Sequence, residues 1–234
     1  MNSAYDWHGR VLQTALNEEP SLSLDFYSYG VMLRKREDDT ITEYAVDPAQ
    51  VAVALAAKVT FDTGLLSGDT LLIRTEGVKK TVVEYRKGQK TGIFLEGSDT
   101  ALRIPLPPLL MIRTTSEDRN PNYAVYAVKR KPKSLDVALF QAPLPNVFNS
   151  GSICWGTVQR VSDTALTGAS LVEDWAMLLG SPFGDHAVSG KSASFPQDIR
   201  KKLIELEQKD TRRYPTTDLI PARKTLAQVL GDKS

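Results

Sequence analysis

Alternating apolar residues near the N-terminus predict a pair of β-strands. The apolar positions on the two sides of the polar turn 37–40 are Leu22, Leu24, Phe26, Val31 and Leu33 before it, and Ile41, Tyr44 and Val46 after it. A period of about two is typical of strands that bury one face. We therefore predict a β-hairpin within residues 21–46.

A helix is predicted directly after this hairpin. Asp47 is a favoured N-cap residue, and Pro48 is favoured at the first helical position. An Ala-rich run containing Val51, Val53 and Leu55 follows. This pattern predicts a buried helix over residues 48–58.

The next part of the chain changes to short runs rich in β-branched and aromatic residues. The runs are 71–73, 81–86, 91–96, 109–112 and 123–128. Residues 87–90 are predicted to form a hairpin turn between two of them. The prolines at 105, 107 and 108 cannot donate ladder hydrogen bonds, so this segment is predicted to be an edge strand or a connection. We predict an antiparallel meander of about four strands.

Beyond the meander, residues 134–167 show no helical period, and irregular segments of this length are usually functional. Three helices are then predicted from apolar stripes at helical spacing. The stripes are Leu171, Val172, Trp175, Leu178 and Leu179, ending at Gly180; Ile199, Leu203 and Leu206; and Leu226, Val229 and Leu230, ending at Gly231. Segregated strands and helices indicate an α+β fold.

Composition narrows the classes of function. The 29 basic and 28 acidic residues give a net charge of +1, which argues against a nucleic-acid module that works by bulk electrostatics. Two short basic runs, 34–36 and 129–131, are expected to be solvated loops or docking points for an acidic partner. No apolar stretch approaches the length of a membrane span and no secretory signal is visible, so we expect a cytoplasmic protein. One cysteine and two histidines exclude a disulfide and thiolate-rich zinc sites, and we expect no metal or cofactor.

The segment Leu144-Pro-Asn-Val-Phe-Asn-Ser-Gly-Ser-Ile-Cys-Trp155 carries the most specific pattern. It resembles the active-site segment of ubiquitin-conjugating enzymes, in which a Pro-Asn pair and an aliphatic and an aromatic residue precede a Gly-x-aliphatic-Cys. Asn146 lies eight residues before Cys154, as in that family. The position before the proline is usually histidine there and is Leu144 here.

Loss of that histidine, with another one after the cysteine, resembles the bacterial ubiquitin-conjugating family D, and His186 lies where the downstream histidine would fall. The family includes a protein of the plasmid-borne PRTRC cassettes, named for their ParB-related and ThiF-related members. The resemblance implies a ThiF-type activating enzyme and a ubiquitin-like protein as partners. It implies a ubiquitin-conjugating core at 47–190, with the hairpin at 1–46 and helices at 191–234 as extensions.

The chemistry of these residue types agrees with the resemblance. A thiolate such as that of Cys154 is a natural acyl carrier, and an amide such as that of Asn146 can stabilise a tetrahedral oxyanion. The small residues 150–152 would leave space for an acyl tail. His186 could deprotonate the attacking amine. Asp174 and Asp185 could orient it, although acidic residues in such places are usually solvated, and Trp155 and Trp175 are expected to pack.

Other interpretations remain open. A lone cysteine is often a buried small hydrophobe, and His186 could be a surface-loop residue. The leading hypothesis is a conjugating enzyme that carries its modifier on Cys154. The alternatives are a non-catalytic ubiquitin-conjugating-like interaction module and a Cys-His hydrolase that cleaves the modifier. The sequence Gly190-Lys191-Ser192 resembles the end of a phosphate-binding loop, but position 185 is Asp185 rather than glycine, so a nucleotide site is not expected.

Overall fold

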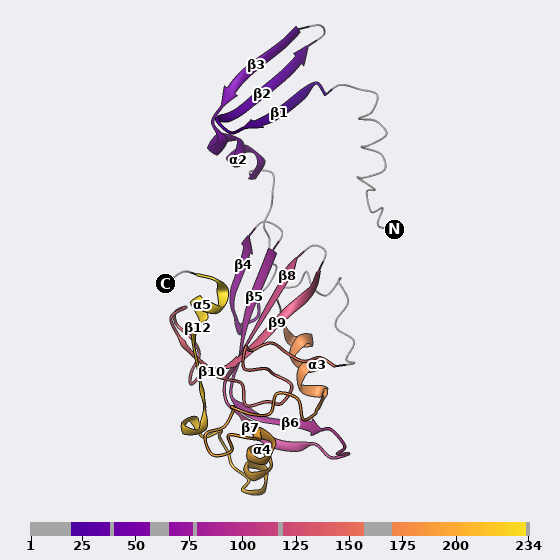
Figure 1. Cartoon of the computed structure of the whole chain (residues 1–234), viewed down its shortest axis with the longest axis vertical. Coiled ribbons are helices and arrows are strands. Elements are labelled where there is room, and N and C mark those ends of the chain that lie inside the picture. Colours follow the sequence, from indigo (N-terminus) through magenta and orange to yellow (C-terminus); the bar gives the residue numbers. More distant parts are fainter. Residues whose placement is uncertain are drawn as a thin grey trace. The chain divides into compact units, whose positions relative to one another are not determined.

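The computed structural model describes residues 20–37, 40–56, 66–76, 79–116, 119–156 and 170–232 (Figure 1). The chain divides into two compact units, residues 1–62 and 63–234. The predicted boundaries after residues 46 and 190 do not coincide with this division, and they stay predictions.

The first unit holds a three-stranded antiparallel sheet rather than the predicted single hairpin. Its strands, in the order of the sheet, are β1 (Leu22–Tyr27), β2 (Gly30–Glu37) and β3 (Thr40–Val46). The extra turn lies at residues 28–29, and Phe26 pairs with Val31 across it. The apolar residues have even numbers before this turn (22, 24 and 26) and odd numbers after it (31 and 33), because a two-residue turn shifts the phase of the alternation. This change of phase in the sequence indicates the second turn, which the prediction missed.

Helix α2 (Pro48–Ala56) begins where it is predicted, with the Asp47 carboxylate accepting a 2.9 Å hydrogen bond from the Ala49 N–H. Its predicted burial is wrong, because Val53 and Leu55 are 69% and 61% exposed. Alanine-rich segments form helices through intrinsic propensity, without requiring a buried face. The predicted residues 57–58 lie outside the described part of the chain. Packing of α2 on the meander stays a prediction.

The second unit is built on a six-stranded antiparallel sheet (Figure 1). Its strands, in spatial order, are β12 (Pro221–Thr225), β10 (Ala138–Gln141), β9 (Arg119–Ala127), β8 (Leu109–Ser116), β5 (Lys79–Arg86) and β4 (Thr70–Glu76). An antiparallel sheet with few helices confirms the α+β class. Strands β10 and β12 were not predicted, because each is short and lies among turn residues.

A smaller sheet explains why the predicted hairpin turn at 87–90 is wrong. Strand β6 (Gln89–Leu95) pairs with β7 (Leu102–Leu106) and with β11 (Pro182–Phe183), whereas β5 pairs with β8. At Gly88 a Cβ would lie 3.0 Å from Pro108, so the chain there crosses closely over the β7–β8 connection. Pro105 lies in β7, an edge strand, and residues 107–108 form a connection, which confirms the prediction for the prolines.

Both faces of the large sheet are buried. Because neighbouring residues of a strand point to opposite sides, each strand contributes to two apolar clusters. Val82, Met111 and Val125 belong to one apolar cluster, and α3 (Val172–Gly180) and α4 (Ile199–Gln208) supply its other side. Residues one position along, such as Val83 and Leu110, belong to a second cluster with α5 (Leu226–Leu230).

The three predicted C-terminal helices are confirmed, except that Val172 is 63% exposed. The short 3₁₀ helix η2 (Thr216–Asp218) lies between α4 and β12. Among the described residues, no helix has the length and apolar character needed to cross a membrane.

Candidate functional site

The segment around Cys154 folds back on itself as a short antiparallel ladder. Phe148 N–H donates to the Ser152 carbonyl over 2.8 Å, and Cys154 N–H donates to the Asn146 carbonyl over 2.7 Å. Val147 and Ile153 form an isolated antiparallel bridge between these two hydrogen bonds. Asn146 and Cys154 are therefore opposite one another across the ladder.

This pairing gives the eight-residue interval a physical meaning. Residues directly opposite in an antiparallel pair present their side chains on the same face, and the next pair presents them on the other. Val147 is fully buried and Ile153 packs against the core, so this pair defines the inner face. Asn146 and Cys154 consequently share the outer face, which borders a pocket.

The tip of the ladder is fastened to β9 through Gly151. Gly151 has φ +92°, and a Cβ there would lie 2.4 Å from the ring of Tyr126. The Tyr126 hydroxyl donates to the Ser150 carbonyl, and Val125 N–H donates to the Gly151 carbonyl over 2.8 Å. Only glycine allows this approach of ring and backbone, so Gly151 fixes where the ladder sits.

A buried lysine supports the ladder from inside. Lys191 is fully buried, and its Nζ donates to the Val147 carbonyl and, over 3.5 Å, to the Ala142 carbonyl. Burial lowers the pKa of Lys191 to about 8. This lysine is occupied by main-chain carbonyls in the interior, unlike the exposed lysine of a phosphate-binding loop.

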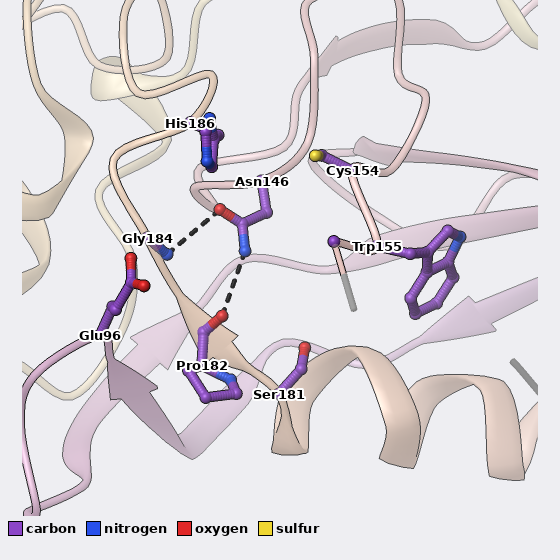
Figure 2. Close-up of a pocket in the computed structure, with 9 residues that line it drawn as sticks. Glu96, Asn146, Cys154, Trp155, Ser181, Pro182, Gly184 and His186 are labelled. Carbon is purple, nitrogen blue, oxygen red and sulfur yellow. Dashed lines mark hydrogen bonds between the residues drawn. The ribbon is translucent and has the colours of Figure 1, made fainter. Parts of the chain in front are cut away.

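Asn146 links the ladder to the segment 182–186 (Figure 2). Its Nδ2 donates to the Pro182 carbonyl over 3.1 Å, and its Oδ1 accepts from the Gly184 N–H over 3.2 Å. Its main-chain N–H donates to the His186 carbonyl over 2.8 Å. Asn146 adopts φ 59°, a left-handed conformation that asparagine tolerates better than most residues. Asn146 therefore holds the ladder and the segment 182–186, which contains His186, in fixed positions relative to one another.

The structure brings Cys154, Asn146 and His186 to one pocket of about 290 Å³. Cys154 is half-buried, and Figure 2 shows its sulfur directed toward the space beside Asn146 and His186. The His186 side chain is 69% exposed, and its Nε2 lies 3.9 Å from the Asp185 carboxylate. An exposed imidazole that lines the same pocket as a half-buried thiol can meet both an incoming substrate and solvent.

Other expectations for the site need correction. Residues 150–152 form the ladder tip and are not among the residues lining the pocket. The small residues that line it are Gly156, Ser181 and Gly184. Asp174 is neither solvated nor beside His186. It is buried at 2% exposure, where it pairs with Arg113 over 2.9 Å and accepts from the Tyr123 hydroxyl over 2.6 Å. Such a buried carboxylate requires this pairing, because desolvation disfavours its charge.

The remaining predicted positions have packing roles. Leu144, in the place of the family's usual histidine, is fully buried in the apolar cluster under the large sheet. Trp175 is buried in the same cluster, as predicted. Trp155 packs edge-on against Tyr123 at 5.1 Å between ring centroids, and it also lines the pocket.

Glu96 is a pocket residue that the sequence did not reveal. It follows β6, and its N–H donates to the Phe183 carbonyl over 2.9 Å. Its carboxylate fills the space where a Cβ at Gly184 would lie, at 2.7 Å. The parallel pairing of β11 with β6 brings Glu96 to the pocket. These two strands are far apart in sequence, so no local sequence pattern predicts their pairing. Within the described residues, no cluster of three or more His, Cys, Asp or Glu side chains could hold a metal ion.

Comparison with known proteins identifies the family. Residues 49–222, more than half of the chain, match the model of prokaryotic E2 family D, E2 being the designation of ubiquitin-conjugating enzymes. No curated protein and no solved structure matches the chain. The chain belongs to prokaryotic E2 family D.

Proposed function

We propose that the protein carries a ubiquitin-like modifier as a thioester on Cys154 and transfers it to an amine. The observation that carries this proposal is the ladder that places Asn146 and Cys154 side by side on the face of one pocket, with His186 at its border. Membership of an E2 family supports the general chemistry, and this geometry supports the assignment of residues.

The first step is acyl exchange. The Cys154 thiolate attacks the carbonyl carbon of the thioester held by a ThiF-type activating enzyme. The new C–S bond forms, and the thiolate of the activating enzyme leaves. Thiolates are good nucleophiles and good leaving groups, so this exchange needs no metal and no nucleotide on this chain.

The second step is aminolysis. A substrate amine attacks the thioester carbonyl, the C–N bond forms, and the C–S bond to Cys154 breaks to regenerate the thiolate. The nitrogen must lose a proton, and we assign its acceptance to the His186 imidazole. The exposed position of His186 suits this role, because the amine arrives from solvent.

Asn146 would act on the oxyanion that forms in both steps. An amide nitrogen has two N–H groups, and the hydrogen bond to the Pro182 carbonyl uses one of them. The second can donate to negative charge near the sulfur. The contacts of Asn146 with Pro182 and Gly184 hold the amide in a fixed orientation, which is the condition for such preorganised stabilisation.

The proposal is tested by mixing the full chain with the ThiF-type enzyme and the ubiquitin-like protein of the same cassette and with ATP. We expect an adduct that disappears with a thiol reductant. Cys154→Ala should give no adduct, and Cys154→Ser should give an oxyester that resists the reductant. An alanine variant that still forms the reductant-sensitive adduct would show that Cys154 is not the carrier. A non-catalytic interaction module would bind the modifier equally well with either residue and form no adduct.

A further inference from the structure

A second pocket lies in the same unit and has a strongly basic border. Its volume is about 430 Å³, and it forms where four connections meet: β5–β6, β7–β8, β9–β10 and the segment between α4 and η2. The basic residues that line it are Lys87, Lys129, Arg130, Lys131, Arg212 and Arg213. Among the described residues that line it, none is acidic, and none of them lines the Cys154 pocket as well.

Two of these cations have an acidic neighbour among the described residues: Lys131 lies near Asp69, and Arg212 lies close enough to Asp210 to help lower the pKa of that carboxyl. Lys131 is the only one of the six with an ion pair to another described residue, at 3.8 Å from Asp69. All six are exposed at the surface. The whole chain has a net charge of +1, so this gathering is a local feature of the fold. Like charges held together repel one another, and an anionic partner would relieve that repulsion.

The apolar part of the lining, residues 105–108, is called the proline floor, and it argues against a site built for a phosphate group. Phosphate cradles rely on main-chain N–H groups from glycine-rich loops or helix N-termini. Pro105, Pro107 and Pro108 lie here instead, together with Leu106, and prolines have no N–H to donate. The floor offers apolar rings, so binding to anions depends on the side chains around it.

The aromatic residues argue against single-stranded nucleic acid, which binds by stacking its bases on exposed rings. Lys131 Nζ lies over the ring of Tyr85, 5.6 Å from its centroid. Tyr214 is only 5% exposed. Neither ring is free to receive a base.

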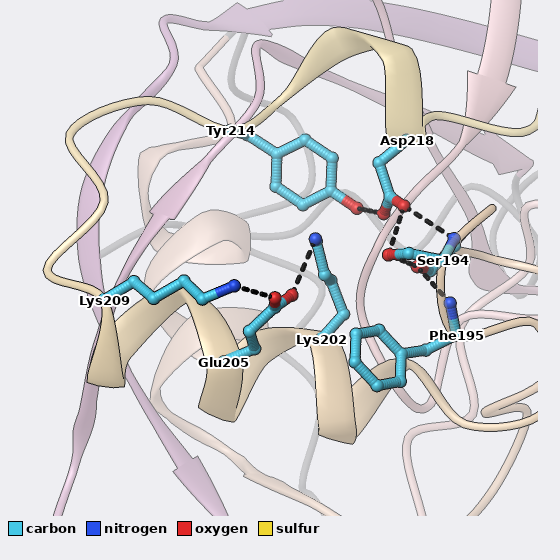
Figure 3. Close-up of polar contacts among 8 residues, drawn as sticks. Ser194, Phe195, Lys202, Glu205, Lys209, Tyr214 and Asp218 are labelled. Atoms are coloured by element: carbon cyan, nitrogen blue, oxygen red, sulfur yellow. Dashed lines mark hydrogen bonds and ion pairs between the residues drawn. The ribbon is translucent and has the colours of Figure 1, made fainter.

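The wall that carries Arg212 and Arg213 is firmly anchored through the next residue, Tyr214 (Figure 3). The Tyr214 hydroxyl donates to the Asp218 carboxylate over 2.9 Å. The same carboxylate accepts from Ser194 N–H over 2.8 Å and from Ser194 Oγ over 2.6 Å. A backbone held in this way loses little conformational freedom when a ligand binds, which favours affinity.

We propose that this basic pocket, defined by the six cations above and the proline floor, docks an acidic peptide segment of a partner protein. Arginine pairs with carboxylates through two parallel hydrogen bonds, and the proline rings provide contact for apolar side chains between the acidic ones. The partner segment therefore carries both acidic and apolar residues. The proposal is independent of the chemistry at Cys154.

The test uses the full chain and a fluorescein-labelled peptide of about ten residues that alternates glutamate and leucine, with fluorescence anisotropy as the readout. The control peptide replaces glutamate by glutamine. We expect the acidic peptide to bind at least about tenfold more tightly than the glutamine peptide, with an affinity that falls as salt is added. Equal affinities for the two peptides would overturn the proposal.

Matched variants locate the binding. Arg130→Glu combined with Arg213→Glu should weaken the acidic peptide at least about tenfold. Lys201→Glu combined with Lys224→Glu makes the same change in net charge at exposed positions outside the pocket, and it should weaken binding by no more than about twofold. If both double variants lost the same affinity for the peptide, the loss would come from the change in net charge alone, which would contradict the proposal. Unchanged thermal unfolding of the variants verifies that they are folded.

A nucleic-acid arm separates the two classes of partner. Single-stranded and duplex oligonucleotides of similar charge are added as competitors at the same salt concentration. We expect neither to displace the peptide at equal concentrations of charged groups. Displacement that depends on Arg130 and Arg213, with weak binding of the peptide itself, would assign the pocket to nucleic acid and refute the proposal.

Discussion

All four polar atoms of Asn146 form hydrogen bonds. Changes to its side chain can distinguish a structural role of this residue from a role in the chemistry. Asn146→Asp keeps the acceptor for Gly184 N–H but loses both amide donors. Asn146→Gly keeps the left-handed backbone and loses the amide entirely. Together these two variants distinguish the contribution of the side-chain amide to transfer from the contribution of the backbone conformation.

We expect Asn146→Ala to lose about 1–3 kcal/mol of unfolding free energy, because it loses the contacts with Pro182 and Gly184 and adopts a strained φ. Urea unfolding measures the loss of stability, and single-turnover discharge of the thioester to lysine measures the rate of transfer. If Asn146 stabilises the oxyanion, both Asn146→Asp and Asn146→Gly slow discharge by about 10²-fold or more. Normal discharge in a destabilised Asn146→Gly variant would leave Asn146 with a structural role alone.

His186→Ala should slow discharge by about 10²-fold while the loading rate stays normal, because exchange between thiols needs no base once the thiolate exists. The main-chain carbonyl that accepts from Asn146 is retained, so stability should change by no more than about 0.5 kcal/mol. The defect should shrink as pH rises toward the pKa of the amine, where free amine no longer requires a base.

Asp185→Asn is the matched control, since Asp185 lies 3.9 Å from the imidazole and is itself exposed. It should leave discharge within about threefold of normal, because exposed ion pairs contribute little. Normal discharge by His186→Ala at neutral pH would make His186 an ordinary surface residue.

At the scale of elements, the ladder depends on one glycine. Gly151→Ala should lower the free energy of unfolding by about 2–5 kcal/mol, since it combines an unfavourable φ with overlap of the Tyr126 ring. Gly97→Ala is the control, because Gly97 has φ +79° with no atom near its missing Cβ. It should lose only about 1 kcal/mol. Chemical denaturation measures both, and equal losses would mean that the close approach of Tyr126 does not constrain the ladder.

The elements also show what the sequence could and could not reveal. Asn146 and Cys154 are neighbours through a local turn, so the resemblance of one short segment to the family's active-site pattern was enough to predict both as site residues. The helical stripes at 171–179 and 199–206 were visible because burial repeats with the helical period. The pairing of β6 with β7 and β11 was not visible, since partners in a sheet are chosen by packing over the whole fold. Glu96 was missed for the same reason.

At the scale of the whole molecule, Lys191 couples the site to global stability. Its pKa is about 8 in the folded chain and near 10.5 as a free side chain. Below pH 8 both states are protonated, and above pH 10.5 both are neutral. Between these values the unfolded chain binds more protons, so the free energy of unfolding rises with pH.

We expect this rise to amount to roughly 3 kcal/mol across pH 8–10.5 in the difference between the normal chain and Lys191→Met. Taking the difference removes the titration of tyrosines and other lysines. Urea unfolding at several pH values measures it. Parallel stability curves for the two chains would show that folding does not lower the pKa of Lys191.

The basic residues illustrate the same contrast between local and global patterns. Residues 129–131 were recognised as a basic run, but Lys87 and the pair Arg212 and Arg213 lie far away in sequence. The fold collects them around one pocket. Net charge gave no hint of this, because it averages over the whole surface.

Intact-mass spectrometry of the loaded chain tests the central claim most directly. After incubation with activating enzyme, modifier and ATP, the chain should gain the mass of one modifier less one water, and a thiol should return it to its original mass. Cys154→Ala should show no gain under the same conditions. A gain of this mass in Cys154→Ala, or its complete absence from the normal chain, would contradict the account that Cys154 carries the acyl group.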